Sequence, residues 1–276
     1  MKQFKKAIDR GDVQLVSEML AENPALASAP ITWGSVFNKC RTEPLHYLSD
    51  APFNSLWNHG RQALLAKVLI EAGAPVDGLP TSGETPLHGA ASLGEPTVAE
   101  VLLDHGANTE MVAKYPGIPD GTPLDFAVHF GMVEVVDLLH RRGAKLLSTP
   151  MAAGAGQLNR VQDEIESLRQ NNEELLDVFR CAAVCDRIAI IQFLLANGLD
   201  CNADIKGATA LHWAAWEAKP HMVKVLLDNG ADPNIKDQRH NLTAHGWAKH
   251  RRKELGPRWG HNQVIALLES QGGGDT

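Results

Sequence analysis

The chain has 276 residues, of which 44% are hydrophobic and only 5% aromatic, so it can form an apolar core and lacks the composition of a disordered or collagen-like protein. Its formal net charge is −7, from 26 Lys and Arg against 33 Asp and Glu, which opposes nonspecific attraction to nucleic acid or to an anionic membrane. We therefore expect no nucleic-acid partner and no membrane partner.

The first predicted element is a pair of short helices between Phe4 and Leu20, and Asn23 and Pro24 end its second helix. The N-terminal stretch is charged and amphipathic and does not have the apolar segment of a secretory signal. Nowhere does an apolar run approach the roughly 18 residues that a membrane-spanning helix needs. We expect a cytoplasmic protein.

Residues 25–42 follow as an irregular stretch that holds Trp33 and Phe37. The stretch is longer than an ordinary connection, so it either packs over the first helices or forms part of a binding wall. A second helical pair runs from Pro44 to Gly73, with an insertion that contains Trp57 between its helices.

The clearest element is TPLHGAASLGEPTVAEVLLDHGAN, from Thr85 to Asn108. Thr85 is a helix N-cap residue type, and Pro86 fits the first helical turn, where its missing N–H is harmless. Small apolar residues predict a thin first helix that ends at Gly94, and a second apolar stripe predicts another helix that Gly106 closes. This pattern predicts two short antiparallel helices.

The same pattern recurs before and after this stretch. The interval from His88 to the closing Gly106 is 18 residues, and other copies either keep that interval or lengthen it to 27. The interval is kept in Thr122–Gly143, Arg180–Gly198 and Thr209–Gly230, it is lengthened in Pro44–Gly73 and Ala244–Gly272, and weaker copies start at Ala7 and Met151. The chain is therefore an array of similar helical pairs.

Two places in the array depart from the pattern. The connection Thr109–Asp120, which carries Tyr115, is long enough to project as a hairpin. The copy Pro150–Leu168 is the most degenerate, and its polar second half predicts an outer helix that continues past the usual end. We expect this copy to be the weakest link of the array.

The copies resemble the ankyrin repeat family, whose TPLHxA signature is matched by Thr85–Ala90 and, with Ala210 in place of proline, by Thr209–Ala214. The resemblance implies a single domain over residues 1–276, an all-α solenoid of about eight helix–turn–helix units with projecting turns or hairpins and a concave face that usually binds another protein. The expected units are residues 1–24, 42–77, 80–110, 120–146, 148–170, 174–202, 205–235 and 239–273.

Histidine recurs at one position of the pattern, where the resemblance implies a hydrogen bond that links repeats rather than catalysis. Asp125 and Arg180 replace histidine in two copies. The position is occupied by His46, His88, His212 and His245 in four others.

The resemblance also implies that the first, fourth and fifth residues after this position face a partner. These residues include many aromatic side chains, more than a merely solvated face needs. The tryptophans elsewhere in the chain either wall the same groove or cap the core. The candidate binding residues are Trp33, Tyr47, Asp50, Trp57, Asp125, Phe126, His129, Trp213, Trp216 and Trp247.

The cysteines and the basic run receive structural interpretations. Cys181 and Cys185 could supply two metal ligands on one helix, but a structural zinc site needs two more at a recognisable spacing, so we expect buried, reduced thiols. The four cysteines of the chain are also too few and too irregular for a disulfide framework. The run Lys249–Lys253 is interpreted as a solvated helix face.

Two classes of function fit these observations. The favoured class is a noncatalytic module, monomeric, that recognises an unidentified protein partner through the aromatic concave face. The alternative is a small-molecule ligand site or an enzyme, with a pocket between the two expanded repeats in which Asp50, Asp125 and His129 would supply acid and base groups and the tryptophans would supply stacking groups. The sequence contains no GxSxG, HExxH or phosphate-binding glycine loop, so we assign no catalytic residue, cofactor or metal.

Overall fold

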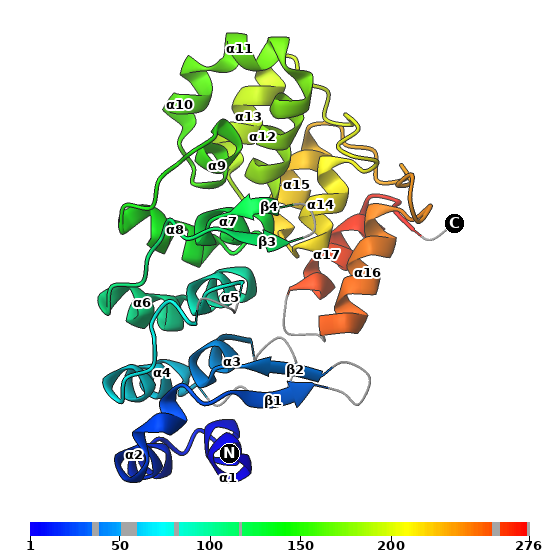
Figure 1. Ribbon diagram of the computed structural model, residues 1–276. Coiled ribbons are helices and arrows are strands. Elements are labelled where there is room, and N and C mark those ends of the chain that lie inside the picture. Colours follow the sequence, from blue (N-terminus) through cyan, green and yellow to red (C-terminus); the bar gives the residue numbers. More distant parts are fainter. Residues whose placement is uncertain (35–38, 51–59, 80–82, 116–117, 256–259, 275–276) are drawn as a thin grey trace. The chain divides into compact units, whose positions relative to one another are not determined.

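The computed structural model describes residues 1–34, 39–50, 60–79, 83–115, 118–255 and 260–274 (Figure 1). The chain divides into two compact units. The first consists of Met1–Ala127 with Glu134–Lys145, and the second of Val128–Val133 with Leu146–Thr276. Both units are built from short helices, which confirms the predicted all-α class.

The first unit stacks helical pairs. Within it, α3 packs on α5, whereas α4 packs on both α2 and α6, so first helices and second helices form separate rows (Figure 1). Its elements are α1 (Lys2–Asp9), α2 (Val13–Glu22), the 3₁₀ helix η1 (Pro24–Ala27), α3 (Pro44–Asp50), α4 (Gln62–Glu71), α5 (Pro86–Leu93) and α6 (Pro96–Asp104), with most of α7 (Pro123–His129) and α8 (Val133–Arg141).

The start of α5 shows why the repeat pattern folds in this way. The Thr85 hydroxyl accepts the backbone N–H of His88, and the imidazole of His88 accepts the backbone N–H of Thr85, so two orphaned donors are satisfied. His88 Nε2 lies 3.1 Å from the backbone oxygen of Gly121 in the following repeat. Gly94 ends the helix at φ 69°. The predicted capping, glycine end and linking histidine are all confirmed here.

Two hairpins project from the first unit. The strands β3 (Ala113–Tyr115) and β4 (Ile118–Gly121) pair antiparallel, which confirms the predicted hairpin. The stretch predicted as irregular contains a second hairpin, since β1 (Ile31–Gly34) pairs with β2 (Lys39–Thr42). This hairpin could not be predicted from the sequence, because each strand has only four residues and is too short to show a clear alternation of apolar and polar residues.

The second unit repeats the same arrangement. The first helices α9, α12, α14 and α16, called here the first-helix row, pack each on the next, and α15 packs on α17 (Figure 1). The elements of this unit are α9 (Thr149–Gly154), α10 (Leu158–Asp163), α11 (Ile165–Gln170), α12 (Asn172–Val184), α13 (Ile188–Ala196), α14 (Ala210–Trp216), α15 (Pro220–Asp228), α16 (Ala244–Leu255) and α17 (His261–Ser270).

Small residues allow the close approach of these helices. Ala182, Ala183, Ala214 and Ala215 are fully buried between members of the first-helix row. Larger apolar side chains such as Ile191 fill the space toward the second helices. As predicted, Cys181 and Cys185 are buried, and the free thiol of Cys201 is buried as well.

The degenerate repeat differs from the others in its outer helix. The expected single outer helix is instead two short helices, since α10 stops at Asp163 and α11, which starts at Ile165, extends the helical segment to Gln170. Only Val161 and Leu168 are buried along these two short helices. This segment therefore buries two side chains fully, while Leu158 and Ile165 pack half-buried against the core.

Candidate binding site

The helix α14 carries the centre of the candidate site. Thr209 and His212 form the same capping box as the α5 repeat, which fixes the start of the helix. Residues Ala210, Leu211, Ala214 and Ala215 are buried against neighbouring helices. Trp213 and Trp216, three residues apart on the remaining face, are half-buried.

A third tryptophan joins these two. Trp247 comes from α16, and its ring centroid lies 5.4 Å from that of Trp213 and 5.5 Å from that of Trp216. Both pairs meet edge to face, with interplanar angles of 82° and 73°. Edge-to-face contact is a favoured geometry for aromatic rings. The three indoles therefore form one fixed cluster.

Hydrogen bonds hold the loop beside this cluster. The carboxylate of Asp237 accepts backbone N–H groups of Arg239, His240 and Leu242. These bonds lower the pKa of Asp237 against the opposing effect of burial. His212 Nε2 lies 3.1 Å from the backbone oxygen of Leu242, so the predicted linking role of this histidine is confirmed. The loop is thereby fixed against α14.

The loop, α14 and α16 enclose an apolar hollow of about 320 Å³, called here the tryptophan hollow. Its rim is exposed at His240 and His250, so it opens to solvent. It is lined by Trp213, Trp216, His240, Leu242, Trp247 and His250. A cavity of this size and character can take one large apolar group.

Two guanidinium groups lie on the tryptophan rings. Arg180 of α12 lies 5.7 Å from the Trp213 ring centroid, and Arg251 of α16 lies 4.8 Å from that of Trp216. His250 stacks on Trp216 at 6.1 Å with an interplanar angle of 17°. These cation–π and stacking contacts hold the indoles in place.

Two titratable groups beside the cluster have shifted pKa values. Burial raises the pKa of Glu217 to about 7, against the opposing charges of Arg251, Lys219 and Arg180. Burial, with the positive charges of Arg180 and Lys206, lowers the pKa of His129 to about 4. The imidazole of His129 is therefore neutral at pH 7.

The structure corrects the predicted aromatic face at two positions. Tyr47 is fully buried and donates a hydrogen bond of 2.6 Å to Asp9 Oδ1. Phe126 is 1% exposed and packs against His88 and Tyr115, at centroid distances of 4.9 Å and 5.9 Å. Both rings are buried by neighbouring elements that the repeat pattern does not describe, so neither presents a free face.

The other predicted residues have separate environments. Trp33 packs on Tyr47 at 5.6 Å and donates to Thr42 Oγ1 at 2.9 Å. Asp125 accepts from Thr122 N and Oγ1, so it replaces the capping histidine of its repeat. Trp57 and the side chain of Asp50 lie outside the described part of the structure. Among the predicted residues that the structure describes, Trp213, Trp216 and Trp247 meet in one cluster of three, and Trp33 and Tyr47 form a separate pair.

Sequence reasoning missed the residues that complete the hollow. His240 and Leu242 lie in a loop whose shape depends on Asp237, and no periodic pattern indicates their position. His250 and Arg251 were predicted only as part of a solvated basic run. Helical spacing could have identified them, because they follow Trp247 by three and four residues on α16.

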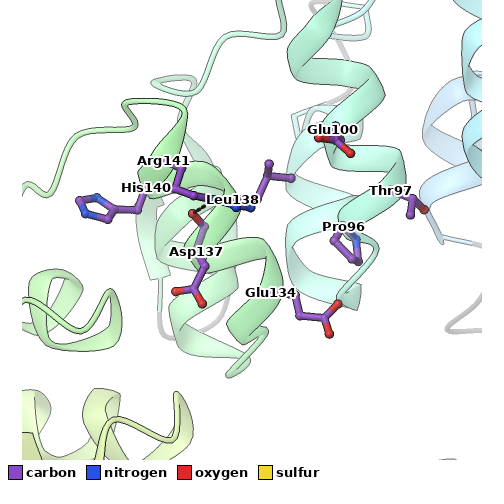
Figure 2. Close-up of a pocket in the computed structure, with 8 residues that line it drawn as sticks. All are labelled: Pro96, Thr97, Glu100, Glu134, Asp137, Leu138, His140 and Arg141. Atoms are coloured by element: carbon purple, nitrogen blue, oxygen red, sulfur yellow. Dashed lines mark hydrogen bonds between the residues drawn. The ribbon is translucent and has the colours of Figure 1, made fainter. Parts of the chain in front are cut away.

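A larger surface groove lies on the first unit (Figure 2). It has a volume of about 560 Å³ between α6 and α8 and is lined by carboxylates of Glu100, Glu134 and Asp137. Arg141 donates to the backbone oxygen of Asp137, and Arg142 pairs with Glu100 and Asp104. The residues that line this groove include charged side chains and no phenylalanine, tyrosine or tryptophan, so the tryptophan hollow is the better candidate for recognition.

The comparison with protein families agrees with the repeat geometry. A model described as "Ankyrin repeats (3 copies)" matches residues 56–149 and 151–237. The chain belongs to the ankyrin repeat family. Among the residues that the structure describes in this ankyrin repeat chain, no group of three or more His, Cys, Asp or Glu could hold a metal ion. Within the same described ranges, no helix is both long and apolar enough to cross a membrane.

Relatives of this ankyrin repeat chain are distant in sequence. The ankyrin repeat protein FPV022 of Fowlpox virus (strain NVSL) is 26% identical over 91% of the chain and 45% of its own length. The B-cell lymphoma 3 protein homolog of Mus musculus is 28% identical over 79% of the chain and 42% of its own length. The chain thus spans less than half the length of these relatives.

A solved structure also aligns with the whole chain. The human ASB11 ankyrin repeat domain covers 96% of both chains at 18% identity, with a TM-score of 0.44.

Proposed function

We propose that this chain is a binding module whose protein partner docks on the tryptophan hollow. Ankyrin repeats are in general protein–protein interaction modules. The observation that carries the specific proposal is the cluster of Trp213, Trp216 and Trp247, which stays half-buried beside an open apolar hollow. Tryptophan is among the residues that contribute most to binding energy at protein interfaces, and these three rings are already held in place before a partner binds.

The rim supports a peptide-like partner. His240 and His250 are exposed, Leu242 is 37% exposed, and a partner that inserts one side chain would also cover these residues. Their polar groups and the apolar floor together give the arrangement of a recognition site, with an apolar centre and a polar rim. We also propose that the chain is cytoplasmic and monomeric. The free thiols are consistent with a reducing compartment such as the cytoplasm.

The alternative function, a small-molecule site or an enzyme between the expanded repeats, stays a prediction. Asp125 is engaged in capping its helix, and His129 is a neutral imidazole at pH 7. In the part of the chain that the structure describes, no arrangement of side chains favours catalysis over partner binding.

The first test compares two tryptophans with similar burial. Trp216→Ala removes a wall of the hollow, whereas Trp33→Ala removes a half-buried indole from the hairpin of the first unit. Tagged chains would capture partners from a cell extract, and quantitative mass spectrometry would identify them. Titration of each purified partner with the purified chain would then measure the binding affinity. We expect Trp216→Ala to weaken partner binding by on the order of 2 kcal/mol and Trp33→Ala to leave it unchanged.

Folding must be measured beside binding, because Trp216 also contacts Arg251 and Trp247. Its truncation should cost about 1–2 kcal/mol of stability, less than the roughly 3–5 kcal/mol expected for a fully buried aromatic. Leu242→Ala tests the hollow at an exposed position and should weaken binding with a smaller effect on the melt. A folded Trp216→Ala chain that keeps full partner affinity would contradict the proposal.

A further inference from the structure

The basic run of α16 divides between two faces of the helix. Lys249, Arg252 and Lys253 are exposed, as predicted for a solvated face. The side chain of Arg251 is only 16% exposed and lies over Trp216, and His250 stacks on the same ring. Part of the run therefore belongs to the tryptophan hollow.

A second set of positive groups lies beside Trp213. Arg180, which lies over Trp213, is 3.4 Å from the carboxylate of Asp177. Lys206 Nζ lies 3.0 Å from both oxygens of the same carboxylate. One carboxylate thus compensates these two cations.

The local charge differs from that of the whole chain. The groups named around the cluster are four cations, Arg180, Lys206, Lys219 and Arg251, and four carboxyls, Asp177, Glu217, Asp237 and Glu254. Glu217 is only partly ionised at pH 7, because its pKa is raised to about 7. The surroundings of the hollow are therefore close to neutral on a chain of net charge −7, and two of their cations, Arg180 and Arg251, lie directly on the tryptophan rings.

We propose that the tryptophan hollow binds a peptide segment in which one apolar side chain is flanked by acidic residues. This inference rests on the proposed function and names the chemistry of the partner. The apolar side chain would fill the space between Trp213, Trp216 and Trp247, while the flanking carboxylates would meet the cations that lie on these rings. Arginine is well suited to this role, since guanidinium pairs with carboxylate by short charge-assisted hydrogen bonds.

A cationic occupant is the obvious alternative for a cluster of tryptophans, since aromatic cages bind ammonium groups. Here the rings of Trp213 and Trp216 already carry the guanidinium groups of Arg180 and Arg251. A further cation in the hollow would be repelled by both groups. The acidic segment is therefore the occupant that the charges favour.

The test starts from an unbiased probe. A displayed library of random 12-residue peptides would be selected on the full chain and, in parallel, on the Trp216→Ala chain. We expect sequences with an apolar residue beside Asp or Glu to be enriched only on the unchanged chain. Synthetic versions of the best peptide would then be titrated by tryptophan fluorescence.

Three peptide forms separate the contributions. Replacing the apolar anchor by Ala should weaken binding at least about 10-fold. Replacing the flanking Asp and Glu by Asn and Gln should weaken it about 5-fold, and Lys flanks should weaken it further. Binding of the acidic form should also fall about 5-fold between 50 and 300 mM NaCl, because salt screens the flanking charges.

A matched pair of variants assigns the charge effect to one residue. Arg251→Met removes the charge beside Trp216 and keeps a long side chain, whereas Arg252→Met removes the neighbouring exposed charge. We expect Arg251→Met to reduce the preference for acidic flanks to within twofold and Arg252→Met to retain it. If Arg251→Met proves unfolded in a thermal melt, the salt dependence of peptide binding to the unchanged chain still shows whether the flanking charges contribute to binding.

The outcomes distinguish the two proposals. Peptides that lose affinity on Trp216→Ala but bind equally well with acidic, amide and basic flanks would overturn the inference and leave the proposed function standing. A preference for Lys flanks would overturn the inference in the same way. Peptides and captured partners that bind the Trp216→Ala chain with full affinity would overturn both.

Discussion

Glu217 follows Trp216 in the chain and is surrounded by cations, yet burial raises the pKa of its carboxyl from 4.5 to about 7. The folded state therefore holds the proton more tightly than the unfolded state. The stability that this group contributes is present below pH 4.5, falls as the pH rises toward 7 and is constant above that.

Glu217→Gln should remove this dependence. Each unit of pKa shift corresponds to about 1.4 kcal/mol of stability. Because Glu217 is only partly buried, we expect a smaller effect: as the pH rises from 4.5 to 8, the free energy of unfolding of the variant should increase by on the order of 1–2 kcal/mol relative to that of the unchanged chain. Urea melts of both chains across this range would measure the difference. His129, whose pKa is lowered to about 4, has the opposite dependence but is common to both chains. A difference that does not vary with pH would contradict the assignment.

Single residues also show what sequence alone can and cannot predict. The capping roles of Thr85 and Thr209 follow from residue type and spacing, and the structure confirms both. The burial of Phe126 does not follow from its repeat position, because Tyr115 covers it from a hairpin specific to this repeat. A repeat pattern describes what the copies share, whereas exposure depends on what the insertions cover.

Among the elements, α9 is held by an unusually close contact with Val128 in the second unit. A Cβ atom placed on Gly154 would lie 2.6 and 2.8 Å from the two methyl carbons of Val128. Alanine normally stabilises a helix by about 1 kcal/mol relative to glycine, but here the clash should win.

We expect Gly154→Ala to destabilise the chain by roughly 1–3 kcal/mol. Val128→Ala removes the opposing methyl groups, so the double variant should be more stable than the two single effects predict. Chemical denaturation of the four chains in this cycle gives the coupling energy. Additive effects would show that the contact is not tight.

The elements around the hollow differ in how well they could be predicted. The helices α14 and α16 follow from the repeat pattern, and their tryptophans were candidates from the start. The loop that carries His240 and Leu242 was not predictable, because Asp237 shapes it by hydrogen bonds to backbone groups. Three of the six residues that line the hollow, His240, Leu242 and His250, could therefore be assigned to it only from the structure.

At the scale of the whole molecule, stability in a repeat protein comes from contacts between neighbouring repeats. The segment α10–α11 buries only Val161 and Leu168, so it should open more readily than the helices around it. In native-state hydrogen exchange we expect its amides to be at least about 10-fold less protected than those of α12 and α14. Equal protection in all three would exclude a weak repeat.

The central claim is that a protein partner engages the three clustered tryptophans of the second unit. The chain has six tryptophans, and each indole N–H gives its own signal in a ¹H–¹⁵N correlation spectrum, assignable by single Trp→Phe substitutions. On titration with a captured partner or a selected peptide, we predict that the signals of Trp213, Trp216 and Trp247 shift together while that of Trp33 stays in place. Saturating binding that leaves these three signals unmoved would contradict the claim.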